Sequence, residues 1–212
     1  MRRLRCQAPA LVFLSLLLLA GTACDTPRRV SIPLDGKTVE ALHWEPAKRL
    51  APAVLLLAPA GQEKESWVSL GTRLRKQGYG VLALELSPGE SGGDELRAAF
   101  GYLRLRKKVD AARIGIVGAD QAANAALEFA AREPLVRLVV LVSPDVKATE
   151  AETVAPLRDY GFRPLLLVGE DAGAGSAVGR LAAASGGRAT VSHAPDAQAS
   201  HDELVAFLER HL

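Results

Sequence analysis

The sequence predicts an α/β protein with a doubly wound, mostly parallel sheet, an antiparallel hairpin at its start and no large cap domain. From Ala53 onward, short apolar runs alternate with amphipathic segments, the pattern of parallel strands that helices cover on both faces. Before Ala53, two strand-like runs flank Asp35-Gly36, a dipeptide that favours a two-residue hairpin turn. The segment between residues 142 and 165 has room for one helix but not for a cap domain.

The predicted strands are short and rich in Val, Leu and Ile. The first two form the hairpin, and the continuous apolar character of the later ones predicts parallel strands buried on both faces. In chain order they cover residues 30–32, 39–44, 53–58, 81–86, 114–117, 136–142, 165–168 and 188–194.

Helices are predicted between these strands from apolar residues at helical spacing. Trp67, Leu70 and Leu74 mark the first, and Gly78 is expected to end it as a C′ residue. The later helices are expected around residues 96–103, 121–132, 147–160 and 202–211.

The start of the chain has the layout of a bacterial export signal. Basic residues at positions 2, 3 and 5 precede an apolar run, residues 10–20, that is too short to span a bilayer comfortably. The small residues that follow lead into Cys24 and resemble a bacterial lipobox. The alternative is an ordinary secretory signal followed by a chance cysteine.

This layout divides the chain into three parts. We predict a lipoprotein signal peptide over residues 1–23, a lipidated tether over 24–29 that begins at Cys24, and one α/β domain over 30–212. The expected location is the bacterial cell envelope, with the domain outside the cytoplasm and anchored to a membrane through Cys24. The other cysteine, Cys6, lies in the signal, so none is left for a disulfide in the domain.

The charge balance points away from nucleic-acid binding. The chain has 26 basic and 24 acidic residues, and three of the basic ones lie in the signal, so the exported part is close to neutral. A Gly-rich segment, residues 173–179, follows a strand and opens a helix like a dinucleotide-binding turn, but no complete βαβ unit with a ribose-binding acid follows it. We therefore predict no cofactor, no metal and no nucleic-acid partner.

One stretch, residues 113–132, organises the rest of the chain. A short apolar strand is followed by the turn Gly118-Ala119-Asp120-Gln121-Ala122 and by an Ala-rich helix. Strand, tight turn of small residues and helix are the context of a nucleophile elbow, G-x-S-x-G, with Asp120 in place of Ser. Asp120 also stands where a helix N-cap belongs, and Asp is a good cap, so the sequence favours this capping role.

These residues resemble the α/β-hydrolase superfamily, and the run Asp110-Ala-Ala-Arg-Ile-Gly-Ile-Val-Gly118 resembles its dienelactone-hydrolase-like members. Most of the resemblance lies within residues 53–142, where residues 87–93 are also similar to an R-G-x-G-x-S turn of the superfamily. The resemblance implies a Ser-His-acid triad and an oxyanion hole built from backbone N–H groups, which here would be those of Gln121 and Ala60.

The chain departs from the implied triad at all three positions. Asp120 replaces the serine, Ala172 stands at the position of the acid, and Ala199 or Gln198 stands at that of the histidine. Asp171 lies one residue before the expected acid, and His201 lies two residues after Ala199.

A capping box is predicted close to this histidine. Ser200 and Glu203 have the required spacing, which would place His201 at an exposed, first helical position.

We interpret the chain as a cell-envelope lipoprotein of hydrolase descent, catalytically degenerate, that acts as a binding or interaction module for an unknown small molecule or envelope protein. The alternative is an active hydrolase with Asp120 as nucleophile, His201 as base and Asp171 as the residue that orients it. A carboxylate nucleophile suits an alkyl carbon, as in the superfamily's haloalkane dehalogenases and epoxide hydrolases. A third possibility, an esterase acting through Ser143, has less support because Ser143 is not on an elbow.

Overall fold

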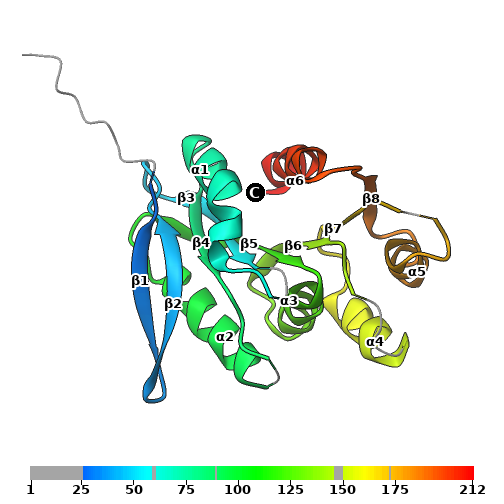
Figure 1. Cartoon of the computed structure of the whole chain (residues 1–212), viewed down its shortest axis with the longest axis horizontal. Coiled ribbons are helices and arrows are strands. Elements are labelled where there is room, and N and C mark those ends of the chain that lie inside the picture. The colour runs from blue at the N-terminus through cyan, green and yellow to red at the C-terminus, as the bar shows by residue number, and fades with distance from the viewer. Residues whose placement is uncertain (1–25, 59–60, 89, 146–149, 172) are drawn as a thin grey trace, which may run out of the picture.

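The structure, a computed structural model, describes residues 26–58, 61–88, 90–145, 150–171 and 173–212 (Figure 1). They form one sheet of eight strands in the order β1-β2-β4-β3-β5-β6-β7-β8, with helices on both faces. The predicted fold class is confirmed, and no large cap domain is present among these residues. The predicted signal peptide and Cys24 lie outside the described residues.

The strands follow the predicted apolar runs closely. β1 pairs antiparallel with β2, β2 pairs antiparallel with β4, and every later neighbouring pair is parallel. The strands are β1 (Arg28–Leu34), β2 (Lys37–Trp44), β3 (Ala51–Leu57), β4 (Gly80–Leu84), β5 (Val109–Ala119), β6 (Val136–Val142), β7 (Leu165–Gly169) and β8 (Thr190–His193).

The helices divide between the two faces of the sheet (Figure 1). Buried residues of α1 and α6 share one apolar cluster, whereas buried residues of α2, α3, α4 and α5 belong to the other. Their bounds are η1 (Lys64–Trp67, a short 3-10 helix), α1 (Val68–Lys76), α2 (Glu90–Arg104), α3 (Gln121–Arg132), α4 (Glu150–Tyr160), α5 (Ala177–Ala184) and α6 (Ala197–His211).

The two clusters lie on opposite faces of the sheet, because successive side chains of a strand point to opposite faces. In β3, Leu55 and Leu57 are buried against the α2 and α3 side, while Val54 and Leu56 are buried against the α1 and α6 side. All four side chains are fully buried. This explains why β3 reads as a continuous apolar run rather than as an alternating one.

Two turns have the backbone conformations that their residues predict. Asp35 and Gly36 both have positive φ, 40° and 78°, as a type I′ hairpin turn requires. Gly78, with φ of 102°, follows α1, and the N–H groups of Gly78 and Tyr79 return to the carbonyls of Arg75 and Leu74. This Schellman arrangement confirms Gly78 as the predicted C′ residue.

The last helix differs from the prediction. α6 begins at Ala197 rather than near residue 202, and its N-cap is Asp196, whose carboxylate accepts a hydrogen bond from the Ala199 N–H at 2.8 Å. The predicted capping box at Ser200 and Glu203 is therefore wrong. Asp196 caps as well as Ser does, and the Ala-rich residues after it favour helix, so the helix starts at the earlier cap.

Two terms describe the ends of the sheet. The parallel strands β3 to β8 all end at one edge, the carboxyl edge, and all begin at the other, the amino edge. In open α/β sheets, ligands bind at the carboxyl edge. None of the helices in the described ranges is long and apolar enough to cross a bilayer.

Candidate functional site

The turn between β5 and α3 has the strained backbone of a nucleophile elbow. Asp120 has φ of 51° and ψ of −124°, a conformation that few non-glycine residues adopt. Its N–H donates to the carbonyl of Val142 on β6, and its carbonyl accepts from the N–H of Ala123 in the first turn of α3. These bonds tie the turn to both the sheet and the helix, so the surrounding structure holds the strained residue in place.

Gly118 allows this close approach of strand and helix. A Cβ atom added at Gly118 would lie 2.5 Å from the carbonyl oxygen of Ala122 and 2.8 Å from the Cα of Ala123. Both are backbone atoms, which cannot rotate away. The predicted need for a small residue two positions before Asp120 therefore has a direct steric cause.

The Asp120 side chain does not cap α3. Asp120 occupies the N-cap position, but its carboxylate accepts no hydrogen bond from the N–H groups of the helix. Caps normally have extended backbone with negative φ, and the positive φ of Asp120 turns its side chain elsewhere. The predicted capping role is wrong. Partial burial raises the pKa of this carboxyl group, and the nearby charge of Asp145 raises it further.

A cavity of about 320 Å³ at the carboxyl edge brings together two of the predicted site residues, Asp120 and His201. Its walls come from the elbow, from the ends of β6 and β7, from η1 and from the first turns of α6. The lining residues are Gln62, Ser66, Trp67, Ala119, Asp120, Val142, Ser143, Glu170, Ala194, Asp196, Ala197, Ser200, His201 and Leu204.

His201 reaches this cavity because α6 begins earlier than predicted. The histidine lies in the helix proper rather than at its first position, and it is partly buried. Its ring lies 6.0 Å from that of Trp67, centre to centre. Burial lowers the pKa of His201, the Arg73 charge lowers it further, and the Asp202 charge opposes both. The imidazole is therefore mainly neutral at pH 7 and able to accept a proton.

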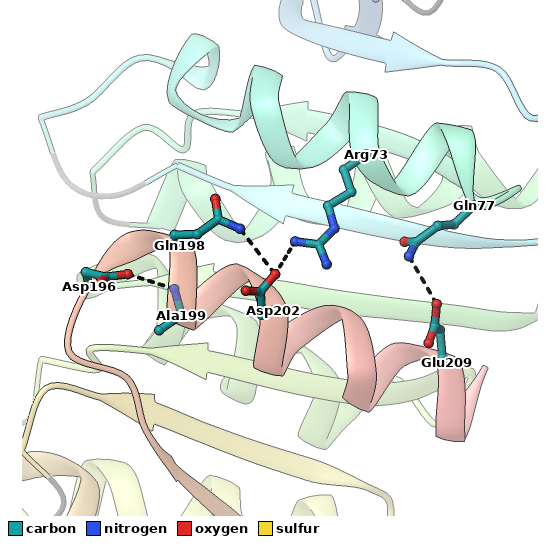
Figure 2. A network of polar contacts seen from close by, with 7 residues as sticks. All are labelled: Arg73, Gln77, Asp196, Gln198, Ala199, Asp202 and Glu209. Carbon is teal, nitrogen blue, oxygen red and sulfur yellow. Dashed lines mark hydrogen bonds and ion pairs between the residues drawn. The ribbon is translucent and has the colours of Figure 1, made fainter.

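Asp202 on α6 and Asp196 at its N-cap bind partners other than His201. Figure 2 shows the Asp202 carboxylate turned toward α1, where it binds Arg73, and it also accepts a hydrogen bond from Gln198 at 3.2 Å. Asp196 is occupied in capping the helix. Among the described residues the His201 ring donates no hydrogen bond to a carboxylate, so no acid fixes its tautomer and orientation as the acid of a triad does.

Asp171, the predicted orienting acid, is engaged locally. Its carboxylate accepts a hydrogen bond from the Gly173 N–H at 2.7 Å and closes a turn after β7. Asp171 does not line the cavity, whereas its neighbour Glu170 does. Ala172, the position at which the resemblance places the acid, lies outside the described residues.

A larger cavity of about 930 Å³ lies on the other side of the elbow, between the carboxyl edge and helices α2 and α3. Gln121 lines this cavity, while Asp120 and His201 line the smaller one. The lining carries charges of both signs, from Glu85, Asp94, Arg97, Glu128, Arg132 and Glu133. No group of His, Cys, Asp and Glu side chains that could hold a metal ion is found in the part of the chain that the structure describes.

Comparison with known proteins rests on solved structures, since no protein-family model and no curated protein matches the chain. The carboxylesterase EstE1, cloned from a metagenomic library, superposes with a TM-score of 0.66 at 20% identity, over 87% of each chain. An esterase from Pyrobaculum calidifontis gives 0.67 at 15% identity, over 87% of this chain and 85% of the other. The esterase domain of a Rhodothermus marinus protein gives 0.65 at 17% identity, over 87% and 99%.

This protein has the α/β-hydrolase fold. In a nucleophile elbow, the N–H of the residue after the nucleophile contributes to the oxyanion hole, and Gln121 is the residue that follows Asp120. Gln121 is the first residue of α3, where backbone N–H groups have no acceptor within the helix. Ala60, the other predicted donor, lies outside the described residues.

Two further residues of the cavity had little support as site residues in the sequence. Trp67, expected to pack, lines the cavity, and its indole N–H is buried without a hydrogen-bond partner. Ser143 lies at the end of β6 beside the elbow and has a positive φ of 44°. The sequence supports Ser143 only weakly as a nucleophile, and its place directly after a parallel strand puts it at the ligand-binding edge.

Proposed function

We propose that this protein is a cell-envelope lipoprotein whose α/β-hydrolase fold binds a small molecule without turning it over. The arrangement around His201 carries the proposal: the imidazole faces the cavity with Asp120, but no acid holds it. Ester cleavage needs an alkoxide nucleophile and an orienting acid. A carboxylate at the elbow would also repel the negative charge that develops on the carbonyl oxygen.

The cavity chemistry favours a small ligand with a cationic amine. Asp120, Glu170 and Asp196 contribute acidic groups to the lining, and the Trp67 ring supplies an aromatic wall. A cation at such a site is attracted by the carboxylates and by the face of the ring. The unpartnered N–H of Trp67 would be satisfied by an acceptor oxygen on the same ligand.

An active hydrolase is the second candidate, and two observations favour it. The elbow keeps its strained backbone although it carries no serine, and Asp120 shares one cavity with His201. A carboxylate nucleophile followed by histidine-assisted hydrolysis would act on an alkyl carbon rather than on an ester carbonyl.

Turnover assays separate the two candidates. The full-length protein should hydrolyse neither short acyl esters nor alkyl halides nor epoxides above background, and Asp120→Ser alone should stay inactive, since triad members act as a unit. Turnover of an alkyl halide or epoxide that is lost in Asp120→Ala and retained in the exposed control Asp159→Ala would establish the hydrolase instead. Saturable esterase activity of Asp120→Ser, abolished by a second change at His201, would also overturn the proposal.

The anchor is tested by acylation. Cys24 should carry fatty acid when the protein is made in a bacterial host, and the protein should partition into the membrane fraction. Cys24→Ser should abolish both, whereas Cys6→Ser, in the signal, should change neither. Unmodified wild-type protein that is free in the periplasm would contradict the lipoprotein assignment.

A further inference from the structure

We propose that the amino edge of the sheet is a membrane-facing surface that rests on anionic lipid and turns the Asp120 cavity toward the aqueous side. The proposed lipid anchor, Cys24, lies just before the first described residues. The surface itself is carried by described residues of two neighbouring loops, 48–50 and 105–108, which we call the basic–leucine patch.

The patch exposes two leucines. Leu50 is 68% exposed and Leu105 is 78% exposed. Their loops lead into the adjacent strands β3 and β5 and are joined there, because the Ala51 N–H donates to the Lys108 carbonyl at 2.9 Å. The Arg113 guanidinium donates to the Leu50 carbonyl at 2.5 Å and holds that loop, in which Leu50 has a positive φ of 55°. The fold therefore presents both leucines to solvent from fixed positions.

Basic residues flank these leucines along the chain. The two loops carry Lys48, Arg49, Arg106, Lys107 and Lys108 and no acid. The neighbouring acid Glu45 forms an ion pair with Lys108 at 3.3 Å. The helix dipole accounts for basic residues in the last turn of a helix, but these loop residues lie beyond that turn. Exposed leucines among lysines and arginines are typical of surfaces that contact anionic membranes.

Further exposed apolar side chains lie along the amino edge, outside the patch. Phe162 is 91% exposed before β7, and Leu135 is 41% exposed before β6. The guanidinium of Arg188 lies 5.6 Å from the centre of the Phe162 ring. Acids at this edge have partners of their own: Asp110 binds Arg113 at 2.8 Å, and Glu133 accepts from the Leu135 N–H at 3.1 Å.

The carboxyl edge has the opposite charge. The loops and helix starts there carry the acids Glu63, Glu85, Asp94, Asp120, Asp145, Glu170, Asp171 and Asp196. Since the exported chain is close to neutral overall, this segregation gives it a charge asymmetry from one edge of the sheet to the other. A negative membrane surface attracts the amino edge and repels the cavity edge.

The start of β1 lies near the patch, on the outer strand of the sheet. Arg28, the first residue of β1, pairs with His43 near the end of β2. The His43 ring lies 5.5 Å from that of Tyr102, and the guanidinium of Arg106, a patch residue, lies 4.0 Å from the Tyr102 ring centre. Arg28 and the basic–leucine patch are therefore neighbours.

Lysine acylation of the full-length protein tests the surface directly. On phosphatidylcholine vesicles that contain phosphatidylglycerol, we expect Lys48, Lys107 and Lys108 to react about fivefold more slowly than on phosphatidylcholine alone. Lys37, at the hairpin tip, and Lys64, at the carboxyl edge, serve as internal controls and should react at the same rate on both. If each of the five lysines reacts at the same rate on the two kinds of vesicle, the proposal is overturned. It is also overturned if soluble DNA, without vesicles, protects the patch lysines to the same extent.

Variants separate the patch from the anchor. Lys48→Glu/Lys107→Glu and Leu50→Ser/Leu105→Ser should each lower retention on the anionic vesicles, whereas the matched changes Lys37→Glu and Val154→Ser, at an exposed valine of α4, should not. Unchanged retention and footprint in both patch variants would refute the surface. A Cys24→Ser chain that is not acylated but keeps the lysine footprint would show that the patch binds anionic lipid without the anchor.

Discussion

The carboxylate of Asp202 on α6 binds the guanidinium of Arg73 on α1, one residue along the chain from His201 (Figure 2). A second bond between the same two helices joins Gln77 to Glu209 at 3.0 Å. The Arg73 pair thus helps to fix α6 beside α1, and it also engages the acid next to the imidazole. His201 faces the cavity beside a cation and without an orienting carboxylate.

This arrangement predicts opposite effects of two substitutions on the pKa of His201. Arg73→Gln should raise it, because the guanidinium charge that lowers it is removed. Asp202→Asn should lower it further, because the carboxylate charge that favours the imidazolium is removed. An NMR titration of the histidine ring protons, assigned with His201→Gln, measures both changes.

The matched control for this titration is Gln77→Ala. It removes the neighbouring contact between the same helices without changing charge. If Gln77→Ala shifts the pKa as much as Arg73→Gln does, helix packing rather than the guanidinium charge controls the imidazole.

The parts of the structure that the sequence predicted well are those that local chemistry decides. The hairpin depends on Asp35-Gly36, whose positive φ values cost little in these residue types. The position of the elbow depends on an apolar strand, on Gly118 and on an Ala-rich helix, all visible as neighbours in the sequence. The alternation of apolar runs and amphipathic segments was sufficient for the fold class.

The misses arose where distant contacts decide the outcome. Asp120 looks like a cap in the sequence, but the positive φ imposed by β6 and α3 removes its side chain from the helix N–H groups. Asp196 and Ser200 could each cap α6, and in the structure Asp196 does so, which starts the helix at Ala197. That shift moved His201 into the cavity. The contact of Trp67 with His201 joins elements that are far apart in the chain, so no local sequence pattern predicts it.

The steric role of Gly118 predicts a large loss of stability on adding one methyl group. Gly118→Ala should reduce the free energy of unfolding by about 2–3 kcal/mol, because the new Cβ meets backbone atoms of α3 rather than a movable side chain. Gly101→Ala is the matched control: Gly101 lies inside α2, its Cβ would meet nothing within 4 Å, and alanine should stabilise the helix by about 0.5–1 kcal/mol. Urea unfolding of both variants measures the difference. A Gly118→Ala protein as stable as wild type would show that strand and helix can separate there.

The strain at Asp120 predicts that glycine is the more stable residue at the elbow. Asp120→Gly should raise the free energy of unfolding by about 1 kcal/mol, since the positive φ costs about 1–3 kcal/mol and the extra freedom of glycine in the unfolded chain offsets part of the gain. A loss of stability in thermal or urea unfolding would mean that the Asp120 side chain makes a stabilising contact.

The raised pKa of Asp120 predicts a separate effect of Asp120→Asn. Because the folded state binds the proton of Asp120 more tightly than the unfolded state does, ionisation of this group destabilises the fold as pH rises through its folded pKa. Asp120→Asn should therefore be more stable than wild type at pH 7, and the difference should vanish below the ordinary pKa of 3.8. Asp159→Asn, at a carboxylate that is 65% exposed, should show no such trend. Equal stabilities of Asp120→Asn and wild type across this range would contradict the argument.

The buried side chain of His43, on β2, should make the fold less stable in acid. It is 7% exposed, its Nε2 has no hydrogen-bond partner, and its Nδ1 lies 3.5 Å from the Tyr102 hydroxyl. Burial and then the Arg106 charge lower the pKa of His43 from 6.5 to about 4. The unfolded chain therefore binds a proton at a higher pH than the folded chain does, so stability is full above pH 6.5 and falls between pH 6.5 and 4, by about 3 kcal/mol. Urea unfolding at intervals across this range should show the decline in wild type and a flatter profile in His43→Gln, which cannot take up the proton; identical slopes in the two proteins would assign the acid sensitivity to other groups.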